Sequence, residues 1–80
     1  IFWPGAMQIH LSKRILTAWR TLPPEIRRFV EALQINPRPV GVMTIPGRPN
    51  YYEEFISDFW ILWSVDDSGS ETIIRVTISE

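Results

Sequence analysis

The residues of this chain that could act as an acid, a base or a metal ligand are one histidine and nine Asp/Glu, with no cysteine. His10 is the only histidine, and its place on the polar side of a predicted strand favours a solvated role over a catalytic one. Glu53 and Glu54 are adjacent, and adjacent strand residues point to opposite faces, so their carboxylates cannot act together as a general base. Because the chain has one histidine and no cysteine, the sequence predicts no metal site, and we expect no cofactor.

Arg48 and Arg75 are the arginines best placed in the sequence to meet a phosphate group. Arg48 lies in a proline- and glycine-rich loop, and Arg75 lies in the last predicted strand. A plain surface position is the more common role for such residues, so both are weak catalytic candidates. The segment 66–70, Asp-Asp-Ser-Gly-Ser, lacks the later ligands and the final glutamate of a calcium loop, and we predict that it is a hairpin turn.

Overall charge and composition argue against nucleic acids and membranes as partners. The net charge is −1, from eight Lys/Arg and nine Asp/Glu, and it argues against strong binding of nucleic acid, whose phosphates attract basic proteins. The absence of cysteine excludes disulfide bonds and fits a reducing compartment. No apolar run approaches the roughly 18 residues that cross a bilayer. We therefore expect a cytoplasmic protein that does not associate with a membrane.

The N-terminal half predicts one strand and two helices. Residues 7–11 alternate apolar and polar side chains, as a half-buried strand does. Ser12 is a suitable N-cap for a first helix, and Pro23-Pro24 ends that helix and begins a second. The expected buried stripes are Ile15, Leu16, Trp19 and Leu22 in the first helix, and Ile26, Phe29, Val30 and Leu33 in the second.

The C-terminal half predicts most of a sheet. A short extended segment at 40–45 and a turn-rich loop at 46–50 precede strands at 51–57, 59–65 and 71–78. The resulting order, β-α-α-β-β-β, predicts an α+β fold. In it, a helix hairpin packs on one face of a small, mostly antiparallel sheet.

We expect the helices to cover one face of this predicted sheet and to leave the other uncovered. Residues expected to meet the helices are Phe59, Ile61, Trp63 and Val65, with Thr72, Ile74, Val76 and Ile78. The opposite face carries Trp60 and Leu62, with Arg75 beside Trp60, and it is too apolar for an ordinary solvated surface. The predicted partner-binding residues are therefore Trp60, Leu62, Tyr52 and Arg75, with Tyr52 expected to help cover Trp60.

Residues 51–65, Tyr-Tyr-Glu-Glu-Phe-Ile-Ser-Asp-Phe-Trp-Ile-Leu-Trp-Ser-Val, resemble the central hairpin of the RelE/ParE family of small bacterial toxins. The likeness extends from Met7 to about Ile78. It includes the helix joint Leu22-Pro23-Pro24-Glu25-Ile26, Asn36-Pro37 followed by Gly41, Pro46-Gly47, and Ser57-Asp58-Phe59 in place of the family's Gly-Asp-Tyr. The resemblance implies the same α+β fold and a role in a bacterial toxin–antitoxin system.

The family usually carries arginines in this hairpin, and the resemblance places Glu53, Phe55 and Trp60 at those positions. Of the three, only Trp60 is expected to lie beside Leu62 on the uncovered face. Members that cut messenger RNA use basic residues on the sheet, with Arg, His or Tyr near the C-terminus, to activate a ribose 2′-OH. This chain ends Arg75-Val76-Thr77-Ile78-Ser79-Glu80, without the usual His-Arg or Tyr. The sequence thus argues against the usual ribonuclease activity and leaves open whether the protein is an enzyme.

The resemblance leads to a principal hypothesis and two alternatives. In the first, a RelE/ParE-like protein acts by protein–protein binding, with an antitoxin-like partner or as a homodimer. In the second, an active toxin inhibits gyrase or cleaves mRNA with an atypical site that includes Arg48 and Arg75. In the third, the chain is an unrelated small α+β domain. Residues 1–6 are expected to be a tag or cloning remnant or an N-terminal arm, and residues 7–80 to form a single domain.

Overall fold

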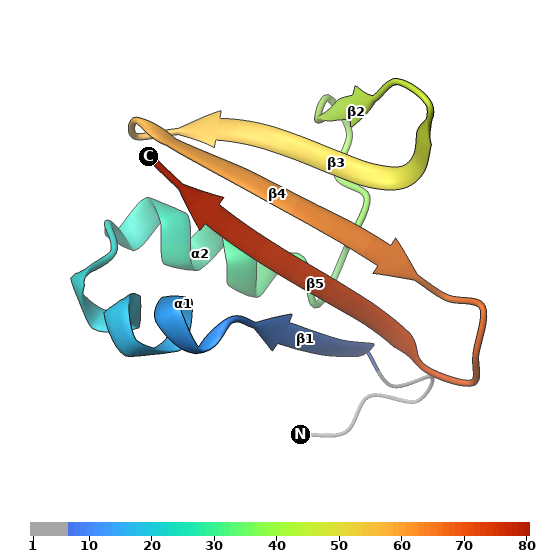
Figure 1. Ribbon diagram of the computed structural model, residues 1–80, viewed down its shortest axis with the longest axis horizontal. Coiled ribbons are helices and arrows are strands. Elements are labelled where there is room, and N and C mark those ends of the chain that lie inside the picture. Colours follow the sequence, from blue (N-terminus) through green and yellow to red (C-terminus); the bar gives the residue numbers. More distant parts are fainter. Residues whose placement is uncertain (1–6) are drawn as a thin grey trace.

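Five strands, two α-helices and a short 3-10 helix make up the part of the chain that the structure, a computed structural model, describes (residues 7–80; Figure 1). The elements are β1 Met7–Leu11, α1 Lys13–Ala18, the 3-10 helix η1 Trp19–Thr21, α2 Pro24–Ala32, β2 Met43–Ile45, β3 Arg48–Ile56, β4 Phe59–Asp66 and β5 Thr72–Ser79. The strands form one sheet in the order β1-β5-β4-β3-β2. β1 is parallel to β5, and the other neighbours are antiparallel. The expectation for residues 1–6 lies outside the described residues.

The helices form a layer on one face of the sheet. Ser12 caps α1, since its side-chain oxygen accepts a hydrogen bond from the Ile15 amide at 3.2 Å. Pro24 opens α2, where the amide that proline lacks would have no helical partner. The core between α2, β4 and β5 consists of Ile26, Val30, Leu33, Ile61, Trp63, Val65, Ile74 and Val76. The predicted α+β fold, with a helix hairpin on one face of a mostly antiparallel sheet, is confirmed.

Two local expectations were wrong. Leu16 is 60% exposed, although the sequence predicted it in the core. Neighbouring residues of a helix point about 100° apart around its axis. Because Ile15 is the buried residue of this six-residue helix, Leu16 points away from the core. The loop predicted at 46–50 is shorter, because β3 begins at Arg48 and pairs with β2 across Pro46-Gly47. Gly47 suits that tight turn with a φ of 75°. The extended segment before it therefore becomes an edge strand.

The turn between β3 and β4 lies at Ser57–Asp58, so β3 ends at Ile56, one residue before the predicted end of the strand. Both residues have positive φ, 51° and 67°, as in the type I′ turn whose twist matches that of the flanking strands. This two-residue turn sets the register, in which Phe55 pairs with Trp60. The register decides which side chains of the two strands share a face.

Candidate functional site: the outer face of the sheet

The face of the sheet opposite the helices, here called the outer face, carries an exposed aromatic patch. Directly opposed strand residues share a face, and β3 and β4 oppose Phe55 to Trp60 and Glu53 to Leu62. Met43 of β2 is opposed to Glu53 on the other side. The exposed fractions are 47% for Phe55, 42% for Trp60 and 43% for Met43. Within residues 7–80, no helix covers these side chains.

All three positions at which the family resemblance places arginines lie on this outer face. The expectation that only Trp60 would lie beside Leu62 was wrong, because Glu53 is paired directly with Leu62 and Phe55 with Trp60. Alternation along a strand groups Glu53 with Phe55, but the register of the hairpin is needed to place that pair beside Trp60. Where the family usually has cations, the outer face therefore presents one carboxylate and two aromatic rings.

The aromatic rings are in contact. The Phe55 and Trp60 rings lie 4.8 Å apart at an interplanar angle of 51°, a tilted arrangement typical of favourable aromatic pairs. Near the start of β3, the guanidinium carbon of Arg48 lies 5.0 Å from the centre of the Tyr51 ring. Arg48 thus makes a cation–π contact within its own strand.

The other half of the outer face is polar and includes Arg75. Arg75 is exposed and is opposed to Ser64 on one side and His10 on the other. The prediction that it lies beside Trp60 was wrong, since Trp60 is opposed to Ser79, four residues further along β5. At the rise of a strand this separates the two by about 13 Å. The structure instead brings Arg75 next to His10, a neighbour that sequence reasoning did not supply.

Tyr52 lies on the helix side of the sheet, away from the other predicted partner-binding residues. It is opposed to the buried Trp63, and the two rings stack with their centres 5.8 Å apart. Its hydroxyl oxygen accepts a hydrogen bond from Nε of Arg38 at 3.0 Å. The structure therefore separates Tyr52 from Trp60 and Leu62 and gives it a packing contact.

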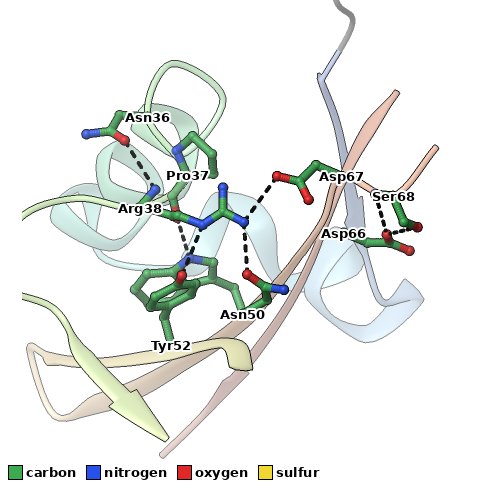
Figure 2. A network of polar contacts seen from close by, with 9 residues as sticks. Asn36, Pro37, Arg38, Asn50, Tyr52, Asp66, Asp67 and Ser68 are labelled. Atoms are coloured by element: carbon green, nitrogen blue, oxygen red, sulfur yellow. Dashed lines mark hydrogen bonds and ion pairs between the residues drawn. The ribbon is translucent and has the colours of Figure 1, made fainter. Parts of the chain in front are cut away.

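Arg38 is the centre of a polar network that sequence reasoning missed (Figure 2). Besides Tyr52, its guanidinium donates to Oδ1 of Asn50 at 3.0 Å and to Oδ2 of Asp67 at 3.2 Å. The hydrogen bond to Tyr52 first, and then the one to Asp67, raise the pKa of Arg38. The indole N–H of Trp63 donates to the Pro37 carbonyl at 2.8 Å, in the same loop. Together these contacts hold the loop between α2 and β2 against the sheet.

A second polar contact joins the helix layer to the tip of the β3–β4 hairpin. The Ser57 hydroxyl donates to the carboxylate of Glu25, in the first turn of α2. This hydrogen bond is the main cause that lowers the pKa of Glu25. The turn is therefore held from the helix side, which leaves the outer face of the hairpin free.

Other candidate sites are weak. A pocket of about 230 Å³ lies between α1, the start of β4 and the end of β5, and its lining includes Arg14, Ile15, Leu22, Phe59 and Ile78. Among residues 7–80, no three His, Asp or Glu side chains are grouped so that they could hold a metal ion. The longest helix in that range has nine residues, and none there could cross a membrane. The outer face is thus the surface with the clearest departure from an ordinary solvated exterior.

Comparison with known proteins identifies the fold. No protein-family model and no curated protein matches this chain. Among solved structures, a mutant of the E. coli toxin RelE in the free state is similar, with a TM-score of 0.61 and 18% identity over 90% of this chain and 80% of that one. The intact E. coli RelBE toxin–antitoxin complex is also similar, with a TM-score of 0.54 and 24% identity over 90% of this chain and 95% of that one. The RelB–RelE complex of Methanococcus jannaschii matches with a TM-score of 0.50 and 23% identity over 84% of this chain and 86% of that one. The chain has a RelE-like toxin fold.

Proposed function

We propose that this chain is a toxin–antitoxin protein whose outer sheet face binds protein and does not cleave RNA. The observation that carries the proposal is the joint placement of Glu53, Phe55 and Trp60 on that face. An exposed pair of aromatic rings beside Leu62 and Met43 is the kind of surface that anchors a protein partner.

The electrostatics of the outer face also oppose an RNA substrate. Cleavage through a ribose 2′-OH requires cations for the charge that develops on the phosphate. Glu53 occupies the centre of the patch, between Leu62 and Met43. At about 4 Å and a surface-like dielectric, one carboxylate opposes a phosphate charge by about 4 kcal/mol before salt screening. Arg48 stacks on Tyr51, which leaves Arg75 as the candidate cation on the polar half.

An antitoxin-like protein is the partner that the fold suggests. Two of the similar structures, from E. coli and M. jannaschii, are complexes of RelE with the antitoxin RelB. We infer a corresponding interaction for this chain, in the bacterial cytoplasm, with the apolar outer face as part of the interface. A homodimer is the other form of protein binding that this face could support.

A binding and growth experiment tests the proposal. The protein is produced in a bacterial host while growth is followed, and then purified together with the small protein encoded beside its gene. We expect growth to continue and the neighbour to co-purify. Trp60→Ser should weaken the complex by at least about tenfold, as loss of an aromatic interface anchor commonly does. Leu16→Ser is the matched control, because Leu16 is an exposed apolar residue on the helix side, 60% exposed against 42% for Trp60. An unchanged complex in Trp60→Ser would remove the support for the outer face.

A working toxin is the second candidate, and one observation favours it. His10 and Arg75 are opposed on the outer face, so a possible proton acceptor and a cation lie side by side. If this pair cleaves RNA, production of the protein should arrest growth. The arrest should be lost in both His10→Ala and Arg75→Ala, and Arg48→Ala shows whether the second predicted arginine takes part. A gyrase inhibitor would arrest growth independently of His10.

A further inference from the structure

The two halves of the outer face carry opposite charges. One half, on β2, β3 and the start of β4, holds Glu53 among apolar side chains, with the Phe55–Trp60 pair above it. The other half, on β5 and β1, holds Arg75 and His10. Within residues 7–80, the only ion pair is Arg38–Asp67, so neither Glu53 nor Arg75 has an ionic partner there.

Glu53 and Arg75 do not pair with each other within residues 7–80. Glu53 lies on β3 and Arg75 on β5, with β4 between them. Glu53 is opposed to Leu62, and Arg75 is opposed to Ser64, two residues further along β4. The spacing between strands and the rise per residue give a separation of about 12 Å between the Cα atoms of Glu53 and Arg75. Asp66, diagonal to Arg75 on the outer face, accepts hydrogen bonds from the amide and hydroxyl of Ser68 at 3.1 and 2.7 Å. These hydrogen bonds first, and then the charge of Arg75, lower the pKa of Asp66, although the two residues form no ion pair. Glu53 is half-buried between Leu62 and Met43, and full cover of the patch requires a cation for it.

A second copy of the same chain can supply that cation. In a face-to-face dimer the two-fold axis lies parallel to both sheets, between them. If the axis crosses the line from Glu53 to Arg75 at its midpoint and at a right angle, each Glu53 lies over the neighbour's Arg75. One axis thus produces two identical ion pairs, as the self-complementarity of a two-fold interface requires. The same operation lays the Phe55–Trp60 pair over β1 of the second copy, where His10 faces outward.

We propose that a second copy of this chain covers the outer face, with Glu53 of each copy paired to Arg75 of the other and the Phe55–Trp60 pair buried between the sheets. This proposal rests on the proposed function, that the outer face binds protein, and it takes the homodimer rather than the antitoxin-like protein as the occupant of that face. The aromatic pair supplies the apolar contact, and the two ion pairs set the relative orientation of the copies.

Charge reversal tests the pairing. Sedimentation equilibrium of the full chain measures the dimer dissociation constant for the original protein, Glu53→Arg, Arg75→Glu and the double reversal. We expect each single reversal to raise the dissociation constant at least about tenfold, because it places like charges opposite each other twice. The double reversal restores opposite charges and should return the constant to within about threefold of the original. Lys13→Glu, an exposed charge reversal on the helix side, is the matched control and should leave the constant unchanged.

The other outcomes overturn the proposal. A chain that stays monomeric up to about 1 mM has no such dimer. A dimer that tolerates both single reversals uses another surface, and a double reversal that fails to restore a weakened dimer refutes the Glu53–Arg75 pairing. Far-ultraviolet circular dichroism verifies that each variant is folded, which is expected because neither side chain is in the core. A monomer that still binds the neighbouring gene product through Trp60 overturns the dimer and leaves the proposed function intact. A monomer that also fails to bind the neighbouring gene product through Trp60 overturns both the dimer and the proposed function.

Discussion

Exchange of tryptophan for phenylalanine at positions 60 and 63 tests the assignment of the two sheet faces. Trp63 is 1% exposed, whereas Trp60 is 42% exposed, although both belong to β4. Trp63→Phe removes the indole N–H that donates to the Pro37 carbonyl. An unsatisfied, partly buried carbonyl costs about 1–3 kcal/mol. The smaller ring leaves roughly 40 Å³ unfilled, which at about 24 cal/mol per Å³ adds about 1 kcal/mol.

The free energy of unfolding should therefore fall by about 2–4 kcal/mol in Trp63→Phe, which for a domain of this size lowers Tm by roughly 10–30 °C. Trp60→Phe keeps an aromatic ring against Phe55 and should change the free energy of unfolding by less than about 0.5 kcal/mol. Urea unfolding followed by far-ultraviolet circular dichroism is the suitable assay, because tryptophan fluorescence itself changes in both variants. The measurement is made at a concentration at which the protein is monomeric, so that association does not add to stability.

Equal losses in the two variants would refute the assignment of faces. So would a loss below about 0.5 kcal/mol in Trp63→Phe, because the buried hydrogen bond to the loop would then contribute nothing. Either result would also remove the structural basis for the outer face as a binding surface, since that basis is the different burial of these two neighbouring tryptophans.

Further predictions concern the contacts around the site. Arg38→Ala should lower the free energy of unfolding by about 1–2 kcal/mol in urea titrations, while Asp67→Asn, which weakens only an exposed ion pair, should cost at most about 1 kcal/mol. Asp58→Gly should stabilise the protein by about 0.5–1 kcal/mol, seen as a higher urea midpoint, because φ is 67° there and glycine is favoured at the second position of a type I′ turn. The lowered pKa of Glu25 contributes stability that is present above its ordinary value of 4.5 and is lost as the pH falls through the lowered pKa of the folded state. Ser57→Ala should raise that pKa toward 4.5 in an NMR titration of the Glu25 carboxyl carbon, and an unchanged titration would exclude the hydrogen bond as its cause.

Periodicity in the sequence predicted the core well, because the helix and strand repeats are local properties of the backbone. Ile26, Val30 and Leu33 are buried as their helical spacing indicated, and Ile61 and Trp63 are buried as strand alternation indicated. Leu16 is the exception, because a six-residue helix buries only one of its side chains.

The Arg38 network had no comparable signal in the sequence. Its hydrogen bonds join residues 12 to 29 positions apart, from a loop, a strand and a turn. Such contacts exist only after the chain has folded, so neither residue type nor spacing indicated that Arg38 and Asn50 would be partners. The same limitation led to the expectation that Tyr52 would lie with Trp60.

The sequence by itself determined which residues alternate along each strand, and so it separated Trp60 and Leu62 from Ile61 and Trp63. Only the tertiary structure decided that Glu53 and Phe55 join the first pair, because a cross-strand neighbour is set by the register of the hairpin and not by the repeat within one strand. Packing of α2 against Trp63 and its neighbours then covered one face and left the other open. The carboxylate of Glu53 and the rings of Phe55 and Trp60 therefore form one surface.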